Sequence, residues 1–139
     1  MVHTKPCSDE RELNPNSGYG RLSEALIDIG IAIKSDPDAA IKLTGWFQTA
    51  GFEDVTTRVL RLPCSPWPEN RRLKVVGQFE MVNTLEKAAA LERGWTEILG
   101  KRKAELEMCI EETRKDLMCN KLYIPLYVTL FSYFSGLVD

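Results

Sequence analysis

Apolar and polar residues follow two different periods along the chain, and these periods predict six elements. Apolar positions spaced by three and four residues indicate helices over residues 21–34, 35–52, 69–94 and 95–118. Segments rich in β-branched and aromatic residues indicate strands over residues 54–62 and 122–134. The predicted order is therefore helix, helix, strand, helix, helix, strand, with no internal repeat.

Proline, glycine and aspartate mark several of these boundaries. Asp36 is expected to cap the second helix, and Gly51 is expected to close it. The prolines at positions 63, 66 and 68 surround Trp67 and exclude regular structure there. The second helix, the first strand and a proline-rich loop thus form one continuous passage.

The same patterns predict which surfaces are covered. The helix over 69–94 is apolar around much of its circumference, so it is expected to be buried. The strand over 122–134 is apolar on both faces and should be covered on both. Trp46 and Phe47 are expected in the core. Two strands do not make a stable sheet alone, so a third segment from the arm or a second copy of the chain must complete it.

Length and composition predict one folded domain behind a short arm. Residues 1–20 are rich in Pro, Asn, Ser and Gly and indicate a flexible arm, whereas residues 21–139 form a single domain. Charged residues make up 27% of the chain and hydrophobic residues 44%, which is typical of globular proteins. The net charge of −2 gives no electrostatic reason to expect a nucleic acid or an anionic membrane as partner.

The cysteines and the single histidine limit the chemistry and suggest a location. The four cysteines form no CxxC pair, and His3 is the only histidine, so no metal site is expected. No apolar run reaches the roughly 20 residues that span a bilayer, and the first residues lack the apolar core of a signal peptide. Reduced thiols in a cytoplasmic protein are the expectation.

One long passage carries a family resemblance: LTGWFQTAGFEDVTTRVLRLPCSPWPENRRLKVVGQFEMVNTLEKAAAL. Its marks are AGF-x-DV before a strand, LP-x-x-PWP after it, and an L-K-x-x-G pattern at Leu73, Lys74 and Gly77. These marks resemble the C-terminal region of class I S-adenosylmethionine-dependent methyltransferases of fungal secondary-metabolite clusters. The helix and the proline-containing strand near the end of the chain continue the resemblance, which covers residues 20 to 131.

The resemblance implies a fold and an absence. The last two strands of the family are an antiparallel pair, so we expect an α+β, truncated methyltransferase-like fold with four main helices and a two-stranded antiparallel pair. Dimerisation or strand exchange would complete the sheet, and a homodimer is expected. The family binds its cofactor through a glycine-rich turn in an N-terminal half that has no counterpart here. The Gly18-Tyr19-Gly20 triplet has no strand before it and indicates a turn, so no cofactor is expected.

The resemblance also implies a pocket, because the segment after PWP walls the substrate site in the family. Carried over by residue, the substrate-binding positions are Trp67, Arg71, Gln78, Phe79, Val82 and Asn83. Alternatives remain for three of them. For Trp67 a hydrophobic plug is favoured over a pocket wall. For the amides of Gln78 and Asn83 the alternative is that they cap a loop or face solvent rather than bind a ligand.

The residues themselves indicate the candidates for proton transfer. His3 has the side chain whose unperturbed pKa suits proton transfer near neutrality. Because it lies in the arm, it is either a disordered residue without a role or an acid/base carried by a lid. Glu80 lies on the apolar helix, where a desolvated carboxyl group can act as a general acid or base. His3 and Glu80 are the catalytic candidates, with Glu86 and Asp28 as alternative carboxylates.

Two hypotheses for the function follow. The first is a cofactor-independent enzyme of fungal natural-product biosynthesis that folds an apolar polyketide- or terpenoid-type intermediate and promotes cyclisation, isomerisation or a pericyclic step. Such a reaction requires shape and a few hydrogen bonds rather than a metal or a nucleophile. The alternative is a non-catalytic, truncated methyltransferase-like protein or a partner subunit of a full-length methyltransferase. A weaker third reading is methylation with a cofactor site built by another chain.

Overall fold

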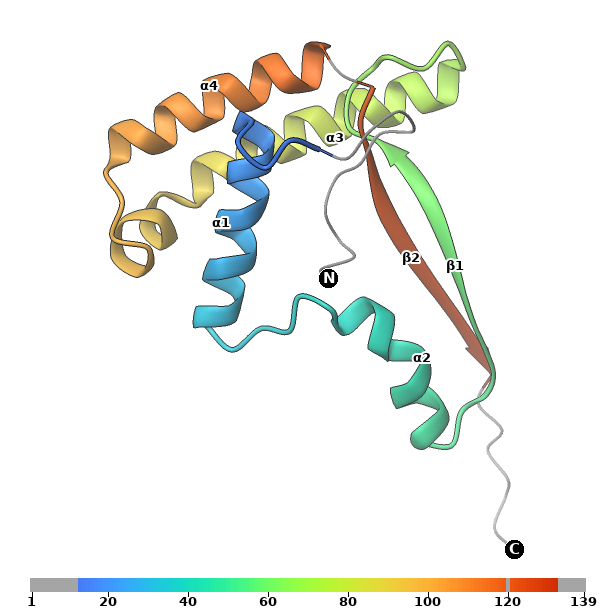
Figure 1. Cartoon of the computed structure of the whole chain (residues 1–139). Coiled ribbons are helices and arrows are strands. Elements are labelled where there is room, and N and C mark those ends of the chain that lie inside the picture. Colours follow the sequence, from blue (N-terminus) through green and yellow to red (C-terminus); the bar gives the residue numbers. More distant parts are fainter. Residues whose placement is uncertain (1–12, 120, 133–139) are drawn as a thin grey trace, which may run out of the picture.

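The fold is α+β, and the order of its elements agrees with the sequence prediction. The computed structural model describes residues 13–119 and 121–132. Along the chain lie α1 (Gly18–Ala32), α2 (Ala39–Thr49), β1 (Glu53–Pro63), α3 (Arg71–Ala90), the π-helical turn η1 (Gly94–Ile98), α4 (Lys103–Cys119) and β2 (Tyr123–Ser132) (Figure 1). Four α-helices and an antiparallel strand pair are thus confirmed, and η1 is an addition.

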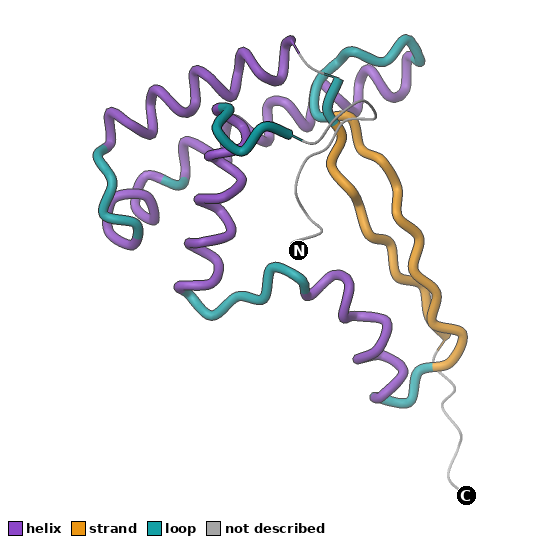
Figure 2. Tube along the Cα trace, viewed as in Figure 1, coloured by secondary structure: helices purple, strands orange, loops and turns teal. Residues whose placement is uncertain are grey.

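The core lies at one end of the molecule, where α1, α3, η1 and α4 meet (Figure 2). The apolar side chains of Leu22, Leu106 and Leu117 are almost fully buried there. Trp95 of η1 joins them, and its indole Nε1 donates a hydrogen bond to the carbonyl of Arg102 at 3.2 Å. Burial of these large side chains gives the helical end its hydrophobic stabilisation.

The strands β1 and β2 form a long antiparallel ribbon that runs from the helical end towards α2 (Figure 1). Its register pairs Thr57 with Thr129 and Pro63 with Tyr123, with an irregularity between Glu53 and Thr56. Side chains alternate between two faces along each strand. One face contacts α2, because the Thr57 hydroxyl lies 2.6 Å from that of Thr44. This is called the α2 face.

The opposite side of the ribbon is the α3 face. From the register, it carries the residue pairs Leu62–Ile124, Leu60–Leu126, Arg58–Val128 and Thr56–Leu130. Helix α3 lies against its Leu62 end and leaves the remainder of the face open. The ribbon is therefore covered at opposite ends on its two faces, by α2 on one and by α3 on the other.

Three differences from the prediction have a local structural cause. The expected helix over 95–118 is divided into η1 and α4, because Gly100 has a positive φ of 64° that ends the first segment. Helix α1 begins at Gly18, so the last three residues of the expected arm belong to it. Asp36 is not the N-cap of α2; Asp38 holds that position, and the Asp36 carboxylate instead accepts from the backbone N–H of Asp38 at 2.9 Å.

The predicted burial of α3, of the last strand and of Trp46 is wrong. Phe79 of α3 is 73% exposed, Leu130 of β2 is 53% exposed, and Trp46 is half exposed. Phe47 does find partners, because its ring stacks on that of Phe131 with a centroid distance of 4.3 Å. These apolar surfaces are exposed because no other described residue covers them.

Candidate functional site

An open hollow between α3 and the end of β1 is the candidate site. It has a volume of about 420 Å³ and is lined mainly by apolar atoms. Its lining residues are Leu62, Val76, Phe79, Glu80, Val82, Asn83 and Glu86. We call it the α3–β1 hollow. A mostly apolar concavity with a few polar groups at its rim is typical of small-molecule sites.

Two local features fix the position of α3 over the hollow. The side chain of Asn70 caps the helix, because its Oδ1 accepts hydrogen bonds from the backbone N–H groups of Arg72 and Leu73 at 3.0 and 3.2 Å. One turn further, Gly77 is buried against the loop after β1, and a Cβ on it would collide with the carbonyl group of Ser65. The helix can approach this loop only with glycine at position 77.

The carboxylate of Glu80 is fixed in the hollow by two hydrogen bonds. Its Oε2 accepts a hydrogen bond from Asn83 Nδ2 at 3.2 Å, and its Oε1 accepts one from Thr84 Oγ1 at 3.3 Å. Thr84 is buried, and its side chain is within hydrogen-bonding reach of the buried phenol of Tyr19. Burial raises the pKa of the Tyr19 phenol well above its usual value, so the phenol stays protonated even in alkaline solution.

The hollow brings together four of the eight predicted site residues. It is lined by Phe79, Glu80, Val82 and Asn83, which lie within about one turn of α3. Asn83 is exposed, and its side-chain amide donates a hydrogen bond to the Glu80 carboxylate. These four positions therefore share one hollow, and their role in substrate binding stays a prediction.

Three of the other four predicted residues lie away from the hollow. The indole Nε1 of Trp67 donates to the carbonyl of Leu122 at 3.3 Å, and its ring meets Tyr123 edge-on, so it closes the end of the ribbon. Gln78 and Arg71 are exposed on α3, and neither lines the hollow. His3 lies outside the described residues.

The sequence prediction left out two lining residues and kept Glu86 only as an alternative. Leu62 is the last apolar residue of the alternating β1 pattern, and Val76 lies one turn before Glu80 on α3. Both follow from periods that the sequence displays. Leu62 begins the LP-x-x-PWP mark and Val76 is an unspecified position of the L-K-x-x-G pattern, but the substrate-binding positions that the resemblance implies include neither.

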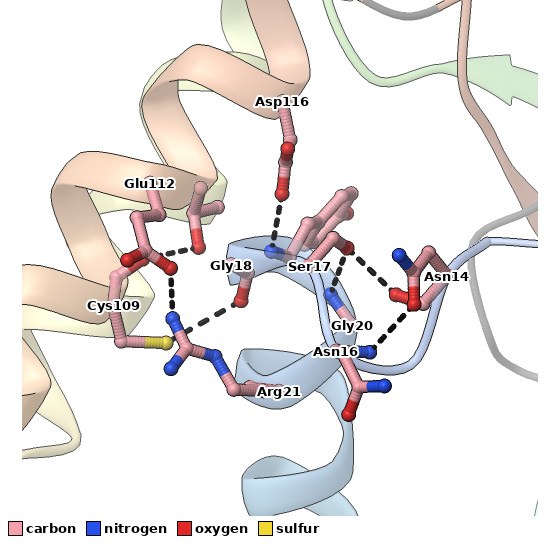
Figure 3. A network of polar contacts seen from close by, with 11 residues as sticks. Asn14, Asn16, Ser17, Gly18, Gly20, Arg21, Cys109, Glu112 and Asp116 are labelled. Carbon is pink, nitrogen blue, oxygen red and sulfur yellow. Dashed lines mark hydrogen bonds and ion pairs between the residues drawn. The ribbon is translucent and has the colours of Figure 1, made fainter.

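Gly18-Tyr19-Gly20 forms the first turn of α1 rather than a separate turn in an arm (Figure 3). The Ser17 hydroxyl accepts from the N–H of Gly20 at 3.1 Å, and the Asp116 carboxylate accepts from the N–H of Tyr19 at 2.8 Å. A carboxylate already occupies the place that a phosphate takes at a helix N-terminus. The triplet therefore has a structural explanation as the docking point of α1.

Gly18 itself allows the close approach of α1 to α4. A Cβ on Gly18 would collide with the α4 backbone at Glu112 and Thr113. The thiol of Cys109 donates to the Gly18 carbonyl at 3.3 Å, and Arg21 forms an ion pair with Glu112 (Figure 3). These contacts join helices α1 and α4, so the two helix surfaces cover each other.

Within residues 13–119 and 121–132, no three His, Cys, Asp or Glu side chains converge in a way that could hold a metal ion. None of the described helices is both long and apolar enough to cross a membrane.

Comparison with curated proteins shows similarity to fungal methyltransferases. The chain is 30% identical over 117 residues to "Methyltransferase pytC" of Aspergillus terreus, which covers 84% of this chain and 36% of that protein. It is 27% identical over 120 residues to "Probable methyltransferase tdiE" of Emericella nidulans, which covers 84% of this chain and 37% of that protein. The chain thus spans little more than a third of the length of these relatives. No family model and no solved structure matches it.

Proposed function

We propose that the chain binds an apolar small molecule in the α3–β1 hollow and promotes its cyclisation or isomerisation without a cofactor. The observation that carries the proposal is the hollow itself, in which exposed apolar side chains surround a held carboxylate. Phe79 and Val82 are 73% and 55% exposed, so a ligand that covers them gains hydrophobic contact. The natural-product class of the ligand comes from the sequence resemblance.

Glu80 gives the hollow a group that can move a proton. Its two hydrogen bonds fix the carboxylate beside the apolar lining, and both donors come from the same helix. A carboxylate placed against the carbon skeleton of a bound ligand can remove a proton beside a carbonyl and return it at another carbon. Atoms and charges balance in such an isomerisation, because the proton that leaves the ligand is the one that returns.

A second candidate function takes its support from the similarity to methyltransferases pytC and tdiE. In this version the hollow still binds the apolar ligand, and the chain acts as the substrate-binding lobe of a methyltransferase assembly. The methyl donor would then be held by residues outside those that line the hollow. The two functions share the binding step and differ in the reaction that follows.

Binding is tested with Nile red, a neutral polycyclic dye whose fluorescence rises and shifts to the blue in an apolar site. Phe79→Ala should weaken its binding roughly tenfold, because the largest exposed wall of the hollow is removed. Met118→Ala is the matched control, since Met118 has the same 73% exposure but lies on α4. Equal effects of both substitutions would contradict a binding site in the hollow.

The reaction is tested by incubating the protein with polycyclic polyketide and terpenoid intermediates and following the products by mass spectrometry. A product of unchanged mass, formed without S-adenosylmethionine and lost in Glu80→Gln, supports isomerisation or cyclisation. A product heavier by one methylene group, formed only with S-adenosylmethionine, supports the methyltransferase assembly. Dye binding without either product would indicate a binding protein and would overturn both reactions.

A further inference from the structure

The charged groups that line the α3–β1 hollow all have the same sign. Glu80 and Glu86 both carry carboxylates, and among the described residues no Lys, Arg or His side chain lines the hollow. Asn83, the remaining polar lining residue, already donates a hydrogen bond to Glu80. The hollow therefore offers a ligand an apolar surface with negatively charged acceptors and no cation for an acidic group.

The two carboxylates differ in what they already bind. Each oxygen of Glu80 accepts one hydrogen bond, from Asn83 and from Thr84. Glu86 is exposed, and no other described residue forms a hydrogen bond or an ion pair with its side chain. A carboxylate accepts hydrogen bonds and donates none. Glu86 is therefore the lining group whose charge is left for a ligand.

Glu86 lies on the same side of α3 as the apolar lining. It follows Phe79 by seven residues and Asn83 by three, and positions with these spacings share one side of a helix. Glu80 and Glu86 are six residues apart, which is about 9 Å along the helix axis. A ligand whose apolar body covers Phe79 and Val82 therefore extends from one carboxylate towards the other.

Basic side chains of the same two elements do not neutralise Glu86 by direct pairing. Arg72 precedes it on α3 by fourteen residues, or about 21 Å along the helix axis. Lys87 is its neighbour in sequence, but adjacent helical positions do not face each other. Arg58 shares the α3 face of the ribbon and is four positions from Leu62, or about 13 Å along the strand. The negative charge at this end of the hollow is thus not matched within the hollow.

We propose that the ligand of the hollow carries a basic nitrogen whose cation pairs with Glu86 while its apolar body covers Phe79 and Val82. A ligand that spans the hollow removes water from the carboxylates, and a covered carboxylate without a partner costs free energy. A protonated amine or an iminium ion supplies that partner by a charged contact, whereas an acidic ligand is repelled. The inference rests on the proposed binding function and narrows its ligand from an apolar molecule to an apolar cation.

This assignment gives the two carboxylates separate roles. Glu86 holds the nitrogen, and Glu80, fixed by its own hydrogen bonds, stays available for the proposed proton transfer. Because the two groups are about 9 Å apart along α3, pairing at Glu86 determines which part of the ligand skeleton lies at Glu80.

The first experiment compares the binding of Nile blue and Nile red to the full chain. The two dyes share one polycyclic ring system, but Nile blue is a cation at neutral pH and Nile red is neutral. Fluorescence titration at low ionic strength gives both dissociation constants. Nile blue should bind about threefold tighter or more, as expected for one partly exposed ion pair. The preference should shrink in ~0.5 M NaCl, because salt screens such a pair.

The second experiment assigns the preference to one residue, with the ratio of the two dissociation constants as the readout. Glu86→Gln should bring this ratio close to one, and Glu86→Lys should make Nile red the tighter ligand. Glu107→Gln is the matched control, because exposed Glu107 lies on α4 and its loss changes the net charge equally. It should keep the preference for Nile blue. Circular dichroism confirms that every variant keeps its helices.

Two results would overturn this inference alone. These are equal affinities of the wild-type chain for the two dyes, and a preference that Glu107→Gln removes as fully as Glu86→Gln. In both cases, Nile red binding that Phe79→Ala weakens would still support the hollow as a binding site. Failure of both dyes to bind would overturn the proposed function and the ligand class together.

Discussion

The carboxylate of Asp116 on α4 accepts a hydrogen bond from the backbone N–H of Tyr19 at 2.8 Å, across 97 residues of sequence. This contact joins the last helix to the first turn of α1. A carboxylate at a helix N-terminus satisfies an N–H group that the helix cannot bond and interacts favourably with the helix dipole.

Asp116→Ala should therefore lower the free energy of unfolding by about 1–2 kcal/mol, as expected for loss of a charged cap. Urea titration followed by circular dichroism measures the change. Glu111→Ala is the control, because exposed Glu111 on the same helix only pairs with Arg114 at 3.5 Å. Its loss should cost less than about 0.5 kcal/mol. Similar losses in both variants would contradict a stabilising helix cap by Asp116.

The contact of Gly77 with the loop at Ser65 predicts a large effect for a single methyl group. Gly77→Ala should destabilise the fold by roughly 2 kcal/mol or more, because neither backbone can move aside without disturbing the hollow. Gly45→Ala provides the comparison, since a Cβ at Gly45 of α2 meets nothing within 4 Å. That substitution should stabilise the chain by about 0.5–1 kcal/mol. Thermal unfolding of the two variants should shift in opposite directions.

Tyr19 predicts how stability depends on alkaline pH. Burial raises the pKa of its phenol above the usual value of about 10, so above that pH the unfolded chain has lost a proton that the folded chain keeps. The stability contributed by Tyr19 is complete below pH ~10 and is lost progressively as the pH rises further. Tyr19→Phe should flatten the fall in unfolding free energy above pH ~10. An unchanged slope would contradict this assignment.

The cysteines should differ in reactivity with iodoacetamide. Cys119 is exposed, whereas Cys109 is buried, and burial raises the pKa of its thiol despite the nearby Arg21. The thiolate is the reactive form, so Cys119 should be alkylated first at pH ~8 and Cys109 should follow only when the chain unfolds. Peptide mapping by mass spectrometry after timed reaction measures both sites. Comparable rates in the folded protein would show that α1 does not protect Cys109.

The part of the site that the sequence predicts is the part encoded by local spacing. Phe79, Val82 and Asn83 recur at helical intervals, so any straight helix places them on one side. Trp67 lies in a loop whose path depends on a distant partner, the carbonyl of Leu122. No local pattern contains that partner, so the sequence favours a plug at Trp67 but cannot say what the plug closes.

For the fold, too, the sequence predicts the features that depend on local spacing and not those that depend on distant contacts. Element order follows from periodicity, and the strand pairing agrees with the resemblance. The exposure of α3 and β2 does not follow, because an apolar pattern states what a surface prefers and not whether another element covers it. The helix is divided at Gly100 because this one residue has a positive φ. The apolar pattern cannot reveal this division, since an isolated glycine is also tolerated inside a helix.

The register that pairs Pro63 with Tyr123 has a further consequence for how the chain folds. No tight turn joins β1 to β2, since α3, η1 and α4 lie between them. The chain must close this long loop before the first strand contact forms, and contacts of high sequence separation form slowly. We therefore expect the helices to assemble first and the ribbon to zip last. Until then β1 is an unpaired, β-branched segment, and newly made chains are most prone to aggregate during this interval.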